Sequence, residues 1–108
     1  MRIDLAQLEF VDERLRDMAL DAEKHFRMEF IVTSLYRIDD NGVHGSLPLR
    51  GLDFGCGSKL IGDTVVEYIN SKWSYDKLRP EKVCCMCHDV GQGLHLHLQV
   101  HPNTERRL

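Results

Sequence analysis

Three histidines near the end of the sequence have a spacing that could place them at one chemical site. They are His95, His97 and His101, in the stretch GLHLHLQVH. Imidazole titrates near neutral pH and is a common metal ligand, so this stretch could transfer protons or bind a metal ion. If the stretch is a strand, His95 and His97 share one face about 6–7 Å apart, while the leucines between them face the core. Alone, the motif favours a half-exposed strand whose polar face happens to be histidine, and other residues must decide.

Two upstream residues have the chemistry to complete a metal site. His44 and Asp53 lie in or beside a glycine-rich central segment, where a loop can bring ligands to the face of a sheet. Zinc takes three or four nitrogen, sulfur or carboxylate ligands, and a catalytic site keeps one position open for water. Two imidazoles and one carboxylate would satisfy both requirements.

Three segments carrying these residues resemble a known family. They are TSLYR (33–37), VHGSLPLRGLDF (43–54) and HDVGQGLHLHLQV (88–100). In this order they resemble the zinc peptidases of the D-alanyl-D-alanine carboxypeptidase and L-alanyl-D-glutamate endolysin type, which share a fold with murein endopeptidases and the hedgehog signalling domain. The resemblance spans roughly residues 30–100.

The resemblance implies a ligand set and a substrate-binding residue. Zn²⁺ would be held by His44, Asp53 and His97. Arg37 would hold a substrate carboxylate or a developing oxyanion with its planar, permanently charged guanidinium. One departure is that eight residues separate His44 from Asp53, where the family usually has six, so GSLPLRGL is interpreted as a loop lengthened by two residues.

The residue that transfers protons is a second departure. Many family members carry Glu or Asp three positions before the last ligand, and here that position is Leu94. His95 is the preferred candidate, because it shares the strand face of His97 and has an ordinary pKa suited to proton transfer at neutral pH. Asp89 is the alternative, although an aspartate at a hairpin is also explained by turn chemistry.

The function that the resemblance implies is that of a zinc-dependent metallopeptidase hydrolysing peptide bonds in peptidoglycan stem peptides. One alternative is a non-catalytic zinc-binding module that keeps the peptidase fold, for example in a phage particle. Another is a structural zinc site begun by Cys84, Cys87 and His88, whose Cys-x-x-Cys spacing suits zinc. Core packing is the preferred interpretation of these cysteines, since buried thiols behave as small apolar side chains.

Length and composition limit the number of domains and the kinds of partner that this chain can have. The chain has 108 residues, enough for a single domain spanning 1–108, and 14 basic against 17 acidic residues give a formal charge of -3. The basic residues are scattered, so no nucleic-acid partner is expected. No apolar run approaches the roughly 20 residues that cross a bilayer, and no signal peptide is recognised, so we expect synthesis in the cytoplasm, reduced cysteines and no membrane partner. A phage-type protein would be released to the cell wall.

The elements expected from periodicity are two amphipathic helices and four strands. Apolar residues at three- and four-residue steps predict a helix from Leu5 to about His25. A second helix, capped by Ser58 or Thr64, would bury a stripe running from Ile61 to Trp73. Strands are expected at 29–34, 51–54, 82–89 and 94–100, with a loop at 38–51 and a hairpin at VGQG. The prediction is an α+β domain with a small antiparallel sheet and both helices on one face, hedgehog/D-Ala-D-Ala peptidase-like.

Overall fold

The computed structural model describes residues 11–34, 49–89 and 93–107. These residues form two helices and six strands. Along the chain they are α2 (Glu13–Phe26), β1 (Val32–Ser34), β2 (Gly51–Gly55), α3 (Lys59–Lys72), β3 (Trp73–Ser74), β4 (Cys85–Asp89), β5 (Leu94–Gln99) and β6 (Glu105–Arg106). No helix within these ranges is long and apolar enough to span a membrane.

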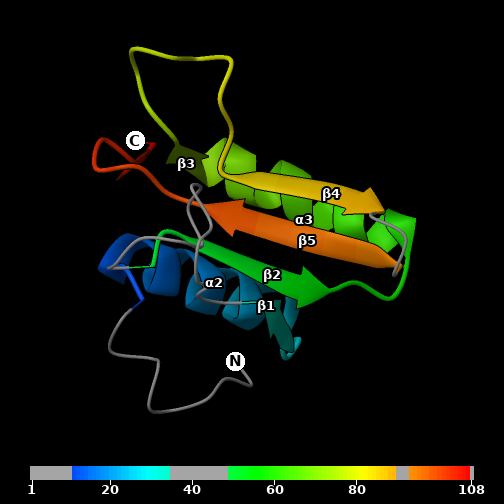
Figure 1. Cartoon of the computed structure of the whole chain (residues 1–108). Helices are drawn as coiled ribbons and strands as arrows, with labels where there is room; N and C mark the ends of the chain where they lie inside the picture. The colour runs from blue at the N-terminus through cyan, green and yellow to red at the C-terminus, as the bar shows by residue number, and fades with distance from the viewer. Residues whose placement is uncertain (1–10, 35–48, 90–92, 108) are drawn as a thin grey trace.

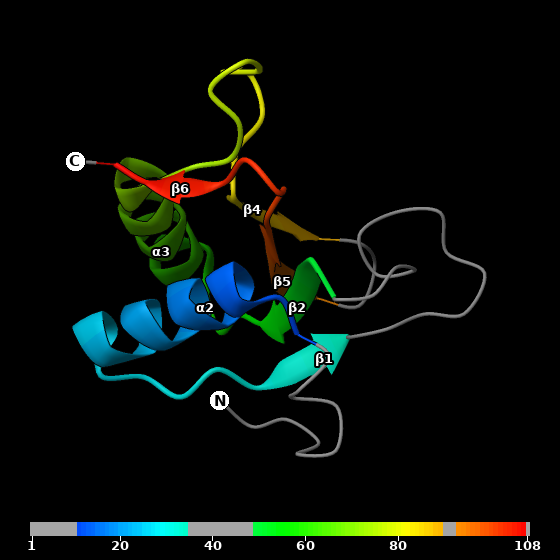
Figure 2. The same ribbon diagram turned by 90° about the vertical axis from the view of Figure 1, so that its left-hand side faces the viewer.

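The main sheet places the histidine strand between two neighbours. Its strand order is β1-β2-β5-β4, and every adjacent pair is antiparallel (Figure 1). Helices α2 and α3 lie together on one side of this sheet (Figure 2). The α+β class, the small antiparallel sheet and the packing of both helices on one face are therefore confirmed.

The core lies between the two helices and the sheet. Strand β5 contributes Leu96 and Leu98, and strand β2 contributes Leu52 and Phe54 opposite them. The helices supply the other large, fully buried side chains: Leu15, Met18, Val65 and Ile69. Burying a leucine completely stabilises the fold by about 1.5–3 kcal/mol, so the leucines fix which face of β5 is turned to the helices. The alternation predicted for this strand is confirmed.

Helix α2 begins later than the apolar periodicity predicts. Val11 forms a β-bridge with Leu49, and Asp12 is the N-cap, its carboxylate accepting the backbone N–H of Arg14 at 2.9 Å. A continuous helix from Leu5 is therefore wrong at residues 11 and 12, because a capping aspartate and a bridge to a distant segment take the place of helical hydrogen bonds. The predicted end near His25 is confirmed, since the helix stops at Phe26.

Helix α3 begins where Ser58 caps it. The Ser58 hydroxyl accepts the backbone N–H of Ile61 at 3.2 Å. The alternative cap, Thr64, lies inside the helix and donates its hydroxyl to the carbonyl of Leu60 at 2.8 Å. Trp73 ends the helix and is buried, as its place in the apolar stripe predicts, but it already belongs to strand β3.

A second, two-stranded sheet was not predicted. Strand β3 pairs antiparallel with β6, joining Trp73 to Arg106 and Ser74 to Glu105. Each strand has two residues, too few for a pattern of alternation to be visible in sequence. The pair holds the end of the described chain against the end of α3.

Candidate metal centre

The side chains of interest lie on the face of the main sheet opposite α2 and α3. We call it the histidine face. Strand register assigns its members, because directly opposed residues share a face: Asp53, Met86, His88, His95, His97 and Gln99. Strands β2, β4 and β5 thus contribute these residues, and β5 supplies the central row.

Asp53 and His97 are brought together at the middle of this face. They are directly opposed residues of β2 and β5, and Asp53 Oδ1 lies 2.6 Å from His97 Nδ1. Both side chains are largely covered, with exposed fractions of 15% and 13%. Two of the three ligands implied by the resemblance are therefore in contact in the described part of the chain.

The second ring nitrogen of His97 is also engaged. His97 Nε2 lies 3.1 Å from Gln99 Oε1, while Gln99 Nε2 donates to the carbonyl of Val83 at 2.9 Å. Because Val83 offers only an acceptor, the Gln99 amide must present its oxygen to the ring, and His97 Nε2 must carry a proton. This bond fixes the orientation of the imidazole, as outer-shell partners do for metal-ligating histidines.

Both nitrogens of His97 consequently face acceptors. With Nε2–H given to Gln99, a neutral ring points its Nδ1 lone pair at the carboxylate of Asp53, which would be repulsive at 2.6 Å. The geometry requires a positive charge between Nδ1 and Oδ1. Either a proton or a metal ion supplies it.

Zinc satisfies the donor chemistry of this pair. Imidazole nitrogen and carboxylate oxygen are both zinc ligands at 2.0–2.2 Å, so two of them on one tetrahedral ion are about 3.3 Å apart. The observed 2.6 Å would have to open by less than about 1 Å. No group of three potential ligands is found within residues 11–34, 49–89 and 93–107, so the described residues provide this pair and no complete set.

His95 and His88 lie next to the pair. His95 is directly opposed to His88 on β4 and to Gly55 on β2, and the ring of His88 lies 6.2 Å from the ring of His97. Gly55 has no side chain, so nothing from this position of β2 covers the flank of His95. From the sequence, His88 is singled out only with the cysteines; the register between β4 and β5 places it on the histidine face.

The structure bears differently on the three remaining predicted site residues, Arg37, His44 and Asp89. Arg37 and His44 lie outside the described residues, so their roles stay predictions. Asp89 is directly opposed to Leu94, and strand alternation assigns it to the helix-covered side rather than to the side of His97. Of the two candidates for proton transfer, the described geometry brings only His95 onto the face of the ligand pair.

The cysteine-based zinc site is contradicted by the fold. Cys84 and Cys85 are completely buried, Cys87 lies on the helix-covered side, and His88 lies on the histidine face. Burial raises the pKa of Cys84 to about 12 and raises that of Cys85 further. Core packing of Cys84 and Cys85, the preferred interpretation, is confirmed.

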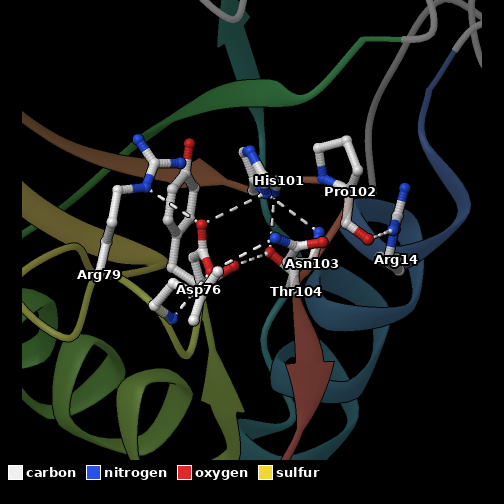
Figure 3. Close-up of polar contacts among 9 residues, drawn as sticks. Arg14, Asp76, Arg79, His101, Pro102, Asn103 and Thr104 are labelled. Atoms are coloured by element: carbon white, nitrogen blue, oxygen red, sulfur yellow. Dashed lines mark hydrogen bonds and ion pairs between the residues drawn. The ribbon is translucent and has the colours of Figure 1, made fainter.

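His101 belongs to a different cluster, at the end of β5 (Figure 3). Its Nδ1 accepts the backbone N–H of Asn103 at 3.0 Å and lies 3.8 Å from Asp76 Oδ2. Arg79 Nε donates to the same carboxylate at 3.1 Å. Hydrogen bonds from Leu78 N–H, Arg79 and Asn103, in that order, hold the pKa of Asp76 below its ordinary value despite burial. The cluster joins the loop after β3 to the turn before β6.

Comparison of the chain with protein-family models, with curated proteins and with solved structures gives no match. The candidate site is therefore defined by its own geometry and chemistry.

Proposed function

We propose that this chain is a zinc-dependent metallopeptidase that hydrolyses peptide bonds in peptidoglycan stem peptides, with a hedgehog/D-Ala-D-Ala peptidase-like fold. The observation that carries the proposal is the Asp53–His97 contact, with Gln99 fixing the outer nitrogen of the ring. A carboxylate and an imidazole in contact on one face of the sheet, with the outer ring nitrogen oriented by a third side chain, are the donor set of a metal site with an outer-shell partner. The substrate class rests on the resemblance of residues 33–37, 43–54 and 88–100.

The residues of this chain would have the following roles in binding the metal and orienting its ligands. Asp53 and His97 hold the metal, and His44 is the third ligand that the resemblance implies. Zinc bound there would supply a Lewis acid and would lower the pKa of bound water. Gln99 holds the Nε2 proton of His97, so that Nδ1, on the side of Asp53, is the nitrogen that would ligate the metal. These groups bind and orient; none of them needs to change protonation during turnover.

His95 is proposed to move the proton. It occupies the next position of the same strand face, two residues from His97, and it is directly opposed to Gly55, which has no side chain. A neutral imidazole can take a proton from an attacking water and return it to the leaving amine. Arg37 is proposed to bind a substrate carboxylate, as the resemblance implies.

The experiment is digestion of defined muropeptides. Chelator-stripped protein is reloaded with zinc and incubated with a disaccharide pentapeptide, and products are identified by mass. Loss of a terminal D-Ala indicates a carboxypeptidase, and cleavage between L-Ala and D-Glu, which leaves the disaccharide bearing a single L-Ala, indicates an endopeptidase. The proposal expects one of these products, abolished by chelator and by His97→Ala but kept in His101→Ala, which removes a histidine outside the histidine face.

Intact muropeptides would overturn the enzymatic proposal if zinc-loaded protein leaves them uncut while a control peptidase cleaves them. If zinc nevertheless binds through Asp53 and His97 in that sample, the chain is the non-catalytic zinc module instead.

A further inference from the structure

Two cysteine thiols meet beneath the first half of α3. A Cβ placed on Gly62 would lie 2.6 Å from Cys87 Sγ and 3.0 Å from Cys56 Sγ. The two thiols also interact with each other through a side-chain hydrogen bond. Because both sulfur atoms occupy the space that a side chain at Gly62 would take, they are neighbours in the fold although 31 positions separate them in sequence.

Backbone pairing explains why they meet. The N–H of Cys56, directly after β2, donates to the carbonyl of Leu94 at 3.0 Å, and Cys87 in β4 is directly opposed to Leu96. The two cysteines therefore flank β5 from either side. Cys87 shares the helix-covered side with Leu96, and Gly62 of α3 packs over both thiols.

This pair differs from the other two cysteines in access. Cys84 and Cys85 have no exposed surface, whereas Cys56 and Cys87 are half-buried. The thiol of Cys56 is also held in place, donating to the carbonyl of Ser58 at 3.0 Å. Cys56 and Cys87 therefore keep solvent-accessible surface next to each other, whereas Cys84 and Cys85 have none.

We infer that Cys56 and Cys87 form a redox-active pair that an oxidant of the peroxide class converts to an intramolecular disulfide. In the first step one thiolate attacks a peroxide oxygen, the O–O bond breaks, and the sulfur becomes a sulfenic acid with release of water. In the second step the other thiol attacks that sulfur, forms the S–S bond and expels a second water. Two thiols lose two electrons and two protons, and peroxide is reduced to two waters.

The disulfide would tie the two strands that flank the histidine strand. It would close a loop from residue 56 to residue 87 and join the end of β2, through α3, to β4. Cross-links of this kind stabilise mainly by restricting the unfolded chain, so oxidised protein should unfold at a higher urea concentration than reduced protein. Burial, the neighbouring Cys56 thiol and Asp63 raise the pKa of Cys87, while Lys59 lowers it by less, so oxidation should become faster as the pH is raised from 7 to about 9. The inference does not depend on zinc binding.

The test is a disulfide map of the full chain. Reduced protein is treated under native conditions with diamide, an azo oxidant that takes up the same two electrons and two protons, and free thiols are then alkylated. Trypsin releases the Cys56 peptide, cut after Arg50 and Lys59, and cleavage at Met86 with cyanogen bromide separates Cys87 from Cys84 and Cys85. The expected major product links the Cys56 fragment to the Cys87 fragment.

Variants and alternative outcomes decide the result. The link should disappear in Cys56→Ser and in Cys87→Ser. The inference is overturned if all four thiols of the wild type are alkylated after diamide, if the dominant disulfide involves Cys84 or Cys85, or if cross-links form only between chains. Because the wild-type map is itself decisive, a variant that fails to fold leaves the test intact.

Discussion

Asp53 Oδ1 and His97 Nδ1, on neighbouring antiparallel strands, lie 2.6 Å apart, while His97 Nε2 faces the amide oxygen of Gln99. This arrangement supplies acceptors to both nitrogens of one imidazole. It therefore calls for a proton or a metal ion between the ring and the carboxylate, and the metal ion is the basis of the proposed zinc site.

Replacing His95 should separate proton transfer from metal binding. If His95 moves the proton, His95→Ala should lower kcat on a muropeptide substrate by about 10²–10⁴-fold, the usual contribution of general acid–base catalysis, and leave zinc content unchanged. The measurement is steady-state kinetics with zinc determined on the same sample. A variant with wild-type kcat would remove His95 from the mechanism, and a variant that loses zinc would make it a ligand.

Lowering the pH should weaken the contribution of Asp76 to the free energy of unfolding. Its folded pKa lies below its ordinary value, chiefly because Leu78 N–H and Arg79 donate to the carboxylate. A depressed carboxyl pKa contributes stability that is fully present above the unfolded value near 3.9 and is lost as pH falls through the folded value. Asp76→Asn should therefore be less stable than wild type at pH 7, and the two should converge below about pH 4 in urea titrations. A difference that stays constant down to pH 2 would contradict this assignment.

Glu23 should stabilise the chain turn after α2. This carboxylate is buried, with an exposed fraction of 8%, and accepts the backbone N–H of Phe30 at 2.7 Å. Glu23→Ala leaves that buried donor without this acceptor and should cost about 1–3 kcal/mol of unfolding free energy, whereas Glu23→Gln keeps an oxygen acceptor and should cost less. Equal free energies for the two variants in urea denaturation would show that the hydrogen bond does not matter.

Gly62 should tolerate a side chain better when Cys87 is shortened. A methyl group there would sit 2.6 Å from Cys87 Sγ, and overpacking of this kind costs about 1–3 kcal/mol. In a Cys87→Ala background the closer clash is gone but Cys56 Sγ still lies 3.0 Å away, so Gly62→Ala should cost less than in the wild type, and the preference of helices for alanine over glycine, about 0.5–1 kcal/mol, offsets part of that cost. A double-mutant cycle of unfolding free energies measures this coupling. Identical effects in both backgrounds would contradict the packing described here.

Local signals predicted much of the fold. The leucines of β5 revealed its buried face, because an apolar residue at every second position fits only a half-buried strand. Ser58 predicted the start of α3, because a serine hydroxyl can cap a helix through a hydrogen bond from a backbone N–H only three residues away. The structure brings Asp53 and His97 into contact; their role as ligands, like those of His44 and Arg37, stays a prediction from the resemblance.

The features that could not be predicted from the sequence depend on contacts between segments that are distant along the chain. His88 joins the histidine face only through the register between β4 and β5. The β3–β6 pair unites two short segments that are distant in sequence, and Cys56 approaches Cys87 only because α3 packs Gly62 over both. The start of α2 was predicted too early because the apolar residues keep a helical spacing through Val11. In the structure Val11 forms a β-bridge with Leu49 and is not part of the helix.

Zinc titration of chelator-stripped protein tests the central claim most directly. The site at Asp53 and His97 predicts one zinc ion per chain in wild type and in Cys87→Ser. Affinity should be weakened by more than about 100-fold in His97→Ala and in Asp53→Ala, because removing even a second-shell partner of a metal site costs 10–100-fold. Wild-type protein that binds no zinc, or a His97→Ala variant that binds it as tightly as wild type, would contradict the proposed metal centre.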